Sequence, residues 1–307
     1  MNSDGQRRKG IRIAVGAALM SGFAVFFNGL AVRRFDDPTV YTTAKNLVAG
    51  AVLLIALAAM VNVSSGPRLA TVPRSAWPTL AIIALLGGAV PFVLFFEGLA
   101  RANSTSSAFI HKTLVVWVAI GATVFLRERI SGLQVGAIGL LVFGHLMLTG
   151  GLGAATFGSA ELLVVGATLC WASEVLIVKR MLVAVPYQIA AVSRMVGGSV
   201  LLVGWLVIKG DLGELGGFAP NQWAWLLFTG AALAAFVATW YAALSMAPAV
   251  DVTAVLVLGA VITGLLNTGF RGVPLTIDSY GYVLIALGAV VVAANALRNP
   301  GRQRARA

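Results

Sequence analysis

Charged residues are scarce in this 307-residue chain: 11% of the residues are Asp, Glu, Lys or Arg, whereas 59% are hydrophobic. A soluble globular domain carries about 25% charged residues, and a disordered chain combines low hydrophobicity with high charge. The composition therefore excludes a soluble enzyme and a disordered chain. An integral membrane protein is the class that remains.

Cysteine and histidine are almost absent. The one cysteine, Cys170, excludes an internal disulfide. The two histidines, His111 and His145, fall in different predicted helices and give little support for a metal site. The sequence contains no nucleotide-binding glycine loop, no HExxH and no CxxC motif. We therefore expect no metal, no cofactor, no catalytic residue and no ATPase domain, so the chain is not predicted to be an enzyme.

Acidic residues number 11 against 22 Lys and Arg, which gives a net charge of +11. In a membrane protein such a basic excess usually lies in the cytoplasmic loops. Nucleic acid is therefore not needed as a partner to explain the charge.

Long apolar runs are abundant instead. A helix needs about 20 apolar residues to cross roughly 30 Å of hydrocarbon, and these runs are apolar on all sides, unlike the alternating strands of a β-barrel. The first run begins with basic residues like a signal peptide, but it is too long, so we expect a retained helix. We predict an all-α integral membrane protein with ten transmembrane helices: Ile11–Ala31, Thr39–Val61, Trp77–Ala100, Thr105–Leu126, Leu133–Thr149, Ala160–Lys179, Tyr187–Ile208, Trp223–Met246, Val252–Phe270 and Ser279–Leu297.

The distribution of Lys and Arg predicts how these helices are oriented. With the N-terminus in the cytoplasm, fourteen of the 22 fall in inner segments and five in outer segments. The other three, Lys45, Lys112 and Arg194, lie inside spans. We therefore expect both basic tails, 1–10 and 299–307, to be cytoplasmic.

The chain is predicted to contain an internal repeat of a five-helix unit, over 11–150 and 159–298. Because five is odd, the second unit enters the membrane from the opposite side, which gives an inverted repeat around a central cavity, an architecture of secondary transporters. The echoes keep their order along the chain: Gly16-Ala17-Ala18-Leu19-Met20 with Gly166-Ala167-Thr168-Leu169-Cys170, Pro38, Lys45 and Gly50 with Pro186, Arg194 and Gly198, and Phe96-Glu97-Gly98 with Tyr241-Ala242-Ala243.

Two stretches, Phe109-Ile110-His111-Lys112-Thr113-Leu114 and Phe125-Leu126-Arg127-Glu128-Arg129-Ile130-Ser131, precede a glycine-rich fifth span. Together they resemble the EamA-type repeat of the drug/metabolite transporter superfamily, and the resemblance covers roughly 12–297 as two copies. The second copy departs from the pattern, with Arg271-Gly272-Val273-Pro274 where the first has Arg127-Glu128-Arg129.

This resemblance implies a cavity lined by spans one, three, four, six, eight and nine. It also implies a bacterial inner-membrane exporter of amino acids and related metabolites. In size and ten-span layout the chain is similar to YddG-type aromatic amino acid exporters.

Ionisable residues inside a span cost roughly 2.5–3.5 kcal/mol each at the helix centre, so each should face a cavity or a partner. Two interpretations stay open. In one the charges neutralise each other; in the other Lys112 or His111 meets a substrate carboxylate and Glu97 binds an amine. Lys45 and Arg194 are candidates for an ion pair or a gate. The six residues are Lys45, Glu97, His111, Lys112, Glu174 and Arg194.

Deep aromatic residues are further candidates for the cavity lining, because aromatic rings stack on flat or cationic ligands. Packing against lipid or other helices is the alternative. These residues are Phe23, Phe27, Trp117, Trp171, Trp240 and Tyr241. A GxxxG pattern at Gly132–Gly136 favours either a homodimer face or close packing that faces lipid.

We therefore predict a secondary-active or facilitative exporter of small organic solutes, first of all aromatic or hydrophobic amino acids, that works by alternating access. Protons are a candidate coupling ion through Glu97 or Glu174. An exchanger of nucleotide sugars or phosphorylated metabolites is an open alternative, favoured by the basic residues. An intramembrane enzyme on lipid-linked substrates is another, although it would need acids or histidines clustered at one membrane face.

Overall fold

A computed structural model describes residues 3–62, 67, 70, 72–101, 110–148, 158–272 and 280–298. Within these ranges every regular element is a helix. The first half consists of α1 (Ser3–Ala31), α2 (Pro38–Asn62), α3 (Trp77–Ile83), α4 (Val90–Arg101), α6 (Leu114–Phe125) and α7 (Gly132–Leu148), with short turns η1 (Val32–Arg34) and η3 (Arg74–Ala76). A π-helical segment, η4 (Ala84–Ala89), joins α3 to α4 in one continuous span.

The second half repeats this plan. It consists of α8 (Ser159–Met181), α9 (Tyr187–Val192), α10 (Gly198–Lys209), η7 (Leu212–Gly216), α11 (Pro220–Met246), α12 (Ala249–Leu256), α13 (Leu258–Arg271) and α14 (Tyr280–Arg298). A second π-helical segment, η6 (Ser193–Gly197), joins α9 to α10. Thus the third and the seventh span each carry one widened turn near their middle.

Local sequence explains several helix ends. Asp37 accepts hydrogen bonds from the backbone N–H of Thr39 at 2.5 Å and of Val40 at 3.3 Å, and Pro38 follows it as the first helical residue of α2. This is the usual arrangement at a helix start. At a C-terminal helix end, Gly210 terminates α10 with a φ of 84°, a left-handed conformation that a residue with a Cβ adopts only with strain.

Among the described residues, seven helices are long and apolar enough to cross a membrane: Gly5–Arg34, Pro38–Val61, Arg74–Gly98, Ser159–Met181, Tyr187–Lys209, Pro220–Met246 and Ala249–Arg271. The predicted fourth, fifth and tenth spans correspond to shorter apolar helices, Ile110–Phe125, Gly132–Gly144 and Tyr280–Asn295. Positions 105–109, 149 and 279 of those predicted spans lie outside the described residues. The count of ten transmembrane helices therefore stays a prediction.

The first helix is longer than predicted, since it begins at Ser3 rather than at Ile11. The expected basic tail is helical here because Arg7 is buried and pairs with Asp251, with 2.7 Å between Nη2 and Oδ2. Arg7, one of the basic residues of the expected tail, is thus part of the folded bundle.

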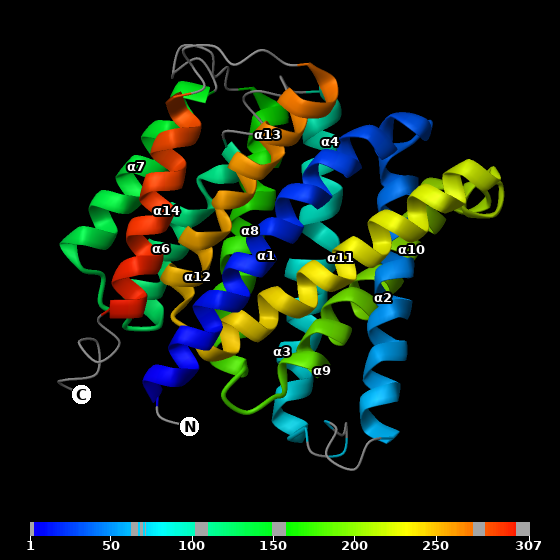
Figure 1. Cartoon of the computed structure of the whole chain (residues 1–307). Coiled ribbons are helices and arrows are strands. Elements are labelled where there is room, and N and C mark those ends of the chain that lie inside the picture. The colour runs from blue at the N-terminus through cyan, green and yellow to red at the C-terminus, as the bar shows by residue number, and fades with distance from the viewer. Residues whose placement is uncertain are drawn as a thin grey trace.

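The two halves run in opposite directions. Gly10, near the start of α1, lies beside Met246 at the end of α11. Lys179, near the end of α8, donates hydrogen bonds to the carbonyls of Leu244 and Ala247. We call this the lower end of the bundle, after its position in Figure 1, where α1 begins and α14 ends. The first helix of one half therefore starts where the first helix of the other half finishes.

The halves also interleave. Helix α1 packs against α11 and α13, and α8 packs in the same way against α4 and α6, while α7 packs against α14. Helices of both halves therefore surround the centre of the bundle.

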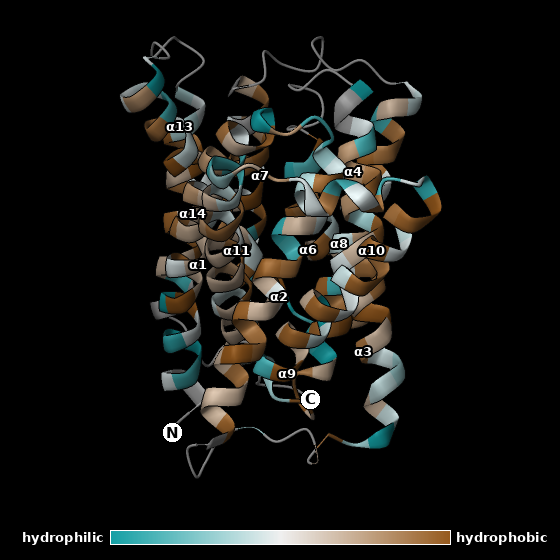
Figure 2. Ribbon diagram, turned by 90° about the vertical axis from the view of Figure 1, so that its right-hand side faces the viewer, coloured by the Kyte–Doolittle hydropathy of each residue, from teal (hydrophilic) through white to brown (hydrophobic). Residues whose placement is uncertain are grey.

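Hydrophobic residues occur along most of the helices, as the colouring of Figure 2 shows, and many large ones are exposed. Ile55 is 70% exposed, Ile208 78% and Phe270 78%. Exposed apolar surface on this scale needs a covering layer, and a lipid bilayer supplies one around seven membrane-length helices.

Candidate functional site

A cavity of about 240 Å³ lies between the two halves. Both halves contribute to its lining, from α1, α2, α4 and the turn before α6 on one side, and from α8, η6, α11 and α12 on the other. Its polar lining residues are Ser21, Asn28, Lys45, His111, Lys112, Glu174, Arg194 and Thr253, and its aromatic ones are Phe92, Trp171, Phe236 and Trp240.

Glu174 and Arg194 form a buried charged pair on one wall. Arg194 Nε lies 3.9 Å from Glu174 Oε1, and both side chains are almost fully buried. The hydroxyl of Tyr241 donates a hydrogen bond to the same carboxylate oxygen. Glu174 thus has both an opposite charge and a hydrogen bond, as a buried carboxylate needs, whereas Arg194 Nε has no hydrogen-bond partner among the described residues.

Two glycines let the π-helical segments meet beside this pair. A Cβ on Gly87 would lie 3.0 Å from Arg194 Nε, and one on Gly88 would lie 2.8 Å from the Cα of Gly198. The carbonyl of Gly87 also accepts a hydrogen bond of 3.3 Å from Trp171 Nε1. The widened turns of the third and seventh spans therefore position Arg194 and Trp171 at the cavity wall.

Lys45 is held differently, without a carboxylate. Its Nζ donates to Asn28 Oδ1 at 3.2 Å. The Tyr41 hydroxyl donates to the same oxygen at 2.5 Å and lies 3.1 Å from Thr229 Oγ1. Hydrogen bonds among Lys45, Asn28, Tyr41 and Thr229 thus connect α2, α1 and α11.

The two halves place a cation over an aromatic ring in the same way. Lys45 Nζ lies 5.1 Å from the ring centre of Tyr41 and 5.9 Å from that of Phe96. Arg194 Cζ lies 6.0 Å from the ring centre of Tyr241. The sequence echoes pair Lys45 with Arg194 and Phe96 with Tyr241, so these contacts are equivalent in the two halves.

Lys112 and His111 line the cavity from the turn before α6, next to α8, which carries Glu174. The His111 ring packs against Trp171 at 4.9 Å and against Phe95 at 5.3 Å between ring centres. Among the residues that the structure describes, no ion pair or hydrogen bond joins Lys112 to another side chain. Its ammonium group is therefore available to a ligand in the cavity.

Seven of the sequence-predicted site residues line this cavity: Lys45, His111, Lys112, Trp171, Glu174, Arg194 and Trp240. Tyr241 stands behind the lining and bonds to Glu174. Four others lie elsewhere. Glu97 pairs with Arg101 at 2.6 Å, Phe27 packs against Phe228 at 4.9 Å between ring centres, and Phe23 and Trp117 are 42% and 41% exposed.

Sequence reasoning missed several lining residues, among them Phe92, Phe236 and Thr253. Phe92 follows Pro91, which breaks the pattern of its span, and that is a signal that could have singled it out. Phe236 and Thr253 carry no signal that distinguishes them from packing residues of the same helices.

A second polar cluster closes the lower end of the bundle and was also missed. Asp251, fully buried in the first turn of α12, pairs with Arg7 and accepts a hydrogen bond of 2.6 Å from Gln134 Nε2. Glu128 accepts from the backbone N–H of Ala249 at 2.9 Å and of Val250 at 3.3 Å. We call Arg7, Glu128, Gln134, Lys179 and Asp251 the lower polar cluster.

The lower polar cluster joins the two halves. Burial raises the pKa of Glu128, although the two backbone hydrogen bonds and the nearby Lys179 lower it in part. Arg7, Glu128 and Gln134 belong to the first half, whereas Asp251 and Lys179 belong to the second. The bundle is therefore fastened across its two halves below the cavity.

The fold and the cavity together define a multi-pass membrane protein with a polar, aromatic-lined centre. The comparisons are more specific. The sequence matches the EamA-like transporter family twice, over residues 8–150 and 158–294. The chain belongs to the EamA-like transporter family and contains two copies of its repeat, which makes it a membrane transporter of small solutes by family.

A solved structure described only as "Crystal structure of protein" is similar in fold. It matches with a TM-score of 0.77 and 16% sequence identity, over 97% of this chain and 99% of that one. At that identity the likeness concerns the fold alone. Comparison with curated proteins gives no match. The predicted superfamily is thus confirmed, and the similarity to YddG-type exporters stays a prediction.

Proposed function

We propose that the chain exports small organic solutes with a carboxylate, aromatic or hydrophobic amino acids in particular, by alternating access around the central cavity. The observation that carries the proposal is the cavity's composition. Three cations, Lys45, Lys112 and Arg194, line it against one acid, Glu174, beside four aromatic residues. A carboxylate satisfies the excess positive charge, and a ring stacks on the aromatic wall.

The orientation of the chain in the membrane rests on the charge distribution. Arg8, Lys9, Arg12, Arg74, Arg127, Arg129 and Arg180 all lie exposed at the lower end. Of the acids there, Glu128 and Asp251 are at least partly buried and hydrogen-bonded. At the other end five basic residues, Arg33, Arg34, Arg101, Lys209 and Arg271, are balanced by six acids, Asp36, Asp37, Glu97, Glu161, Asp211 and Glu214. We assign the lower end to the cytoplasm of a bacterial inner membrane, with both termini there.

Counterflow in proteoliposomes tests this function. Liposomes loaded with unlabelled phenylalanine should take up radiolabelled phenylalanine, and a panel of aromatic and aliphatic amino acids should compete with it. We expect Lys112→Met to lower counterflow at least tenfold, because a charge-assisted hydrogen bond to the carboxylate contributes about 1.5–3 kcal/mol. Lys112→Arg should retain a measurable part of the activity.

Unchanged counterflow by Lys112→Met at equal expression would contradict the role of this side chain. Competition by amines without a carboxylate, equal to that by amino acids, would contradict the substrate class.

A phosphorylated metabolite or nucleotide sugar is the second candidate substrate. The observation that favours it is the same set of three basic lining residues, since phosphate groups are bound by converging Lys and Arg. Its test is the same assay with liposomes loaded with phosphorylated metabolites. Exchange of phosphate esters without exchange of amino acids would replace the first proposal with this one.

A further inference from the structure

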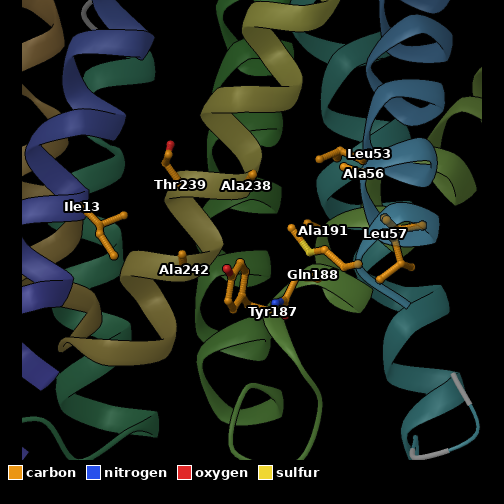
Figure 3. Close-up of a pocket in the computed structure, with 12 residues that line it drawn as sticks. Ile13, Leu53, Ala56, Leu57, Tyr187, Gln188, Ala191, Ala238, Thr239 and Ala242 are labelled. Carbon is orange, nitrogen blue, oxygen red and sulfur yellow. The ribbon is translucent and has the colours of Figure 1, made fainter. Parts of the chain in front are cut away.

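A second pocket, of about 300 Å³, lies apart from the central cavity and shares no lining residue with it. Figure 3 shows Ile13 of α1 on one side and Leu53, Ala56 and Leu57 of α2 on the other, with α11 and α9 between them. Small residues of α11, Ala238 and Ala242, leave the space open. The lining is almost entirely apolar.

The pocket opens to the outside of the bundle. Met60, which lines it, is 43% exposed, and the neighbouring Ile55 on the same helix is 70% exposed. Leu53 lies nine residues before the end of α2 at Asn62, about 14 Å at 1.5 Å per residue. One leaflet of hydrocarbon is about 15 Å thick, so the pocket spans the lower leaflet from its surface to the midplane.

Polar and basic groups mark the surface end of this pocket. Tyr187 and Gln188, the first residues of α9, line it at the lower end. Lys9 lies exposed one turn below Ile13, on the same face of α1 because residues four apart are stacked along a helix. The other exposed bases of this segment point elsewhere: Arg12 lies about 100° and Arg8 about 140° away around the helix from Ile13 at 100° per residue.

We propose that this pocket binds an anionic phospholipid of the lower leaflet, with one acyl chain between α1, α2, α9 and α11 and the phosphate at Lys9 and Gln188. An apolar slot of leaflet depth accepts a chain, and the lysine at its mouth matches a negative headgroup. A neutral lipid would fill the slot but leave the lysine without its partner.

The position of the pocket gives the lipid a structural consequence. Helices α1 and α2 belong to the first repeat, and α9 and α11 belong to the second. A chain bound between them contacts both repeats in the arrangement seen here, so it stabilises this arrangement over one in which the repeats have moved apart.

Photo-crosslinking tests the proposal on the full chain in nanodiscs of phosphatidylcholine. A small fraction of phosphatidylglycerol with a diazirine in its acyl chain is the probe, and the same chain on phosphatidylcholine is the neutral probe. We expect the anionic probe to label the peptides that contain Leu53–Met60 and Tyr187–Val192 in excess over the exposed face of α14. The neutral probe should label them about fivefold less, the effect of one Lys near the headgroup.

Matched variants separate the pocket from the general lipid shell. Ala56→Phe fills the pocket and should remove the excess labelling, whereas Ala58→Phe, on the opposite face of α2, should not. Ala238→Leu is a second filling variant should the first fail to fold by size-exclusion chromatography. Lys9→Gln should abolish the preference for the anionic probe, and Arg8→Gln should preserve it.

Equal labelling of the pocket peptides and of α14, or labelling that the filling variants leave unchanged, would overturn the site. Excess labelling that is the same for both probes, or that Lys9→Gln and Arg8→Gln reduce alike, would overturn the anionic lipid as its occupant.

Discussion

Arg194 and Glu174 place two buried, mutually dependent charges in the wall of the cavity. The pair is buried among apolar helices, yet the two charged atoms are 3.9 Å apart and share their surroundings with the Tyr241 hydroxyl. Such a pair adds little to stability as a whole, but removal of one partner leaves a buried charge alone. The energetic role of each residue therefore depends on the presence of the other.

A double-mutant cycle measures this dependence. Arg194→Met and Glu174→Gln should each lower the free energy of unfolding, by about 3–5 kcal/mol where an unpaired buried charge is left. The double variant should lose less than the sum of the two. Thermal unfolding in detergent is the measurement, with Arg33→Met, at an exposed arginine, as the control. Strictly additive losses would show that the two charges do not interact.

Helix ends and widened turns decide how the elements fit together. Asp37 holds the start of α2 through two backbone hydrogen bonds, and Lys209 at the end of α10 lies 3.1 Å from its second carboxylate oxygen. Burial alone would raise the pKa of Asp37, but these hydrogen bonds lower it overall. A carboxyl group with a lowered pKa stabilises the fold above its ordinary value of 3.8 and loses this contribution as the pH falls through the lowered value.

We therefore expect Asp37→Ala to lower the free energy of unfolding by about 1 kcal/mol at neutral pH, the usual effect of losing a helix cap. The difference from the wild type should shrink as the pH falls below 3.8, because protonated Asp37 no longer accepts these bonds as a carboxylate. Chemical unfolding at a series of pH values gives both numbers. A difference that stays constant into acid would contradict the charged cap.

The fit of the helices also depends on close packing between the π-helical segments η4 and η6. Gly88→Ala places a methyl group against the backbone of Gly198, so we expect a loss of about 1–3 kcal/mol, as overpacking in a tight interior costs. Gly204→Ala on α10 is the matched control, because a Cβ there meets open space. Equal stability of both variants, measured by thermal unfolding, would show that the two π-helical segments can separate freely.

At the scale of the whole molecule, the central cavity and the contacts that join the two repeats below it lie at different levels of the bundle. The central cavity reaches from Asn28 to Trp240, and below it the lower polar cluster ties Arg7 and Gln134 of the first repeat to Asp251 of the second. The proposed alternating access would require that such contacts break when the cavity is exposed on that side. The cluster is thus the part of the molecule whose removal should shift the conformational balance.

Asp251→Asn tests that role. In a Cys170→Ser background, a cysteine at Ala17, which is fully buried between the cluster and the cavity, should react slowly with a water-soluble maleimide. Loss of the charge on Asp251 should speed this reaction about tenfold or more, since a hydrogen bond to a charged group contributes roughly 1.5–3 kcal/mol. Asp36→Asn, an exposed acid at the other end, is the control. No acceleration would mean that the cluster does not hold the lower end closed.

Much of this architecture was predictable because hydrocarbon length and apolar runs are local properties of a sequence. The all-helical membrane class and the membership in the family followed from such runs and from residues such as His111 and Lys112. The equivalence of Lys45 and Arg194 was also visible, as an echo at similar spacing after Pro38 and Pro186.

What only the tertiary structure decided is which charges meet. Glu97, predicted for the cavity, is paired with Arg101 one turn away on its own helix. Asp251, which lies just before the predicted span Val252–Phe270, is buried and paired with Arg7, 244 residues earlier in the chain. The lateral pocket likewise exists only because α1, α2, α9 and α11 meet there. Partners of this kind depend on how helices rotate and pack against one another, and that is a long-range property which no single stretch of sequence contains.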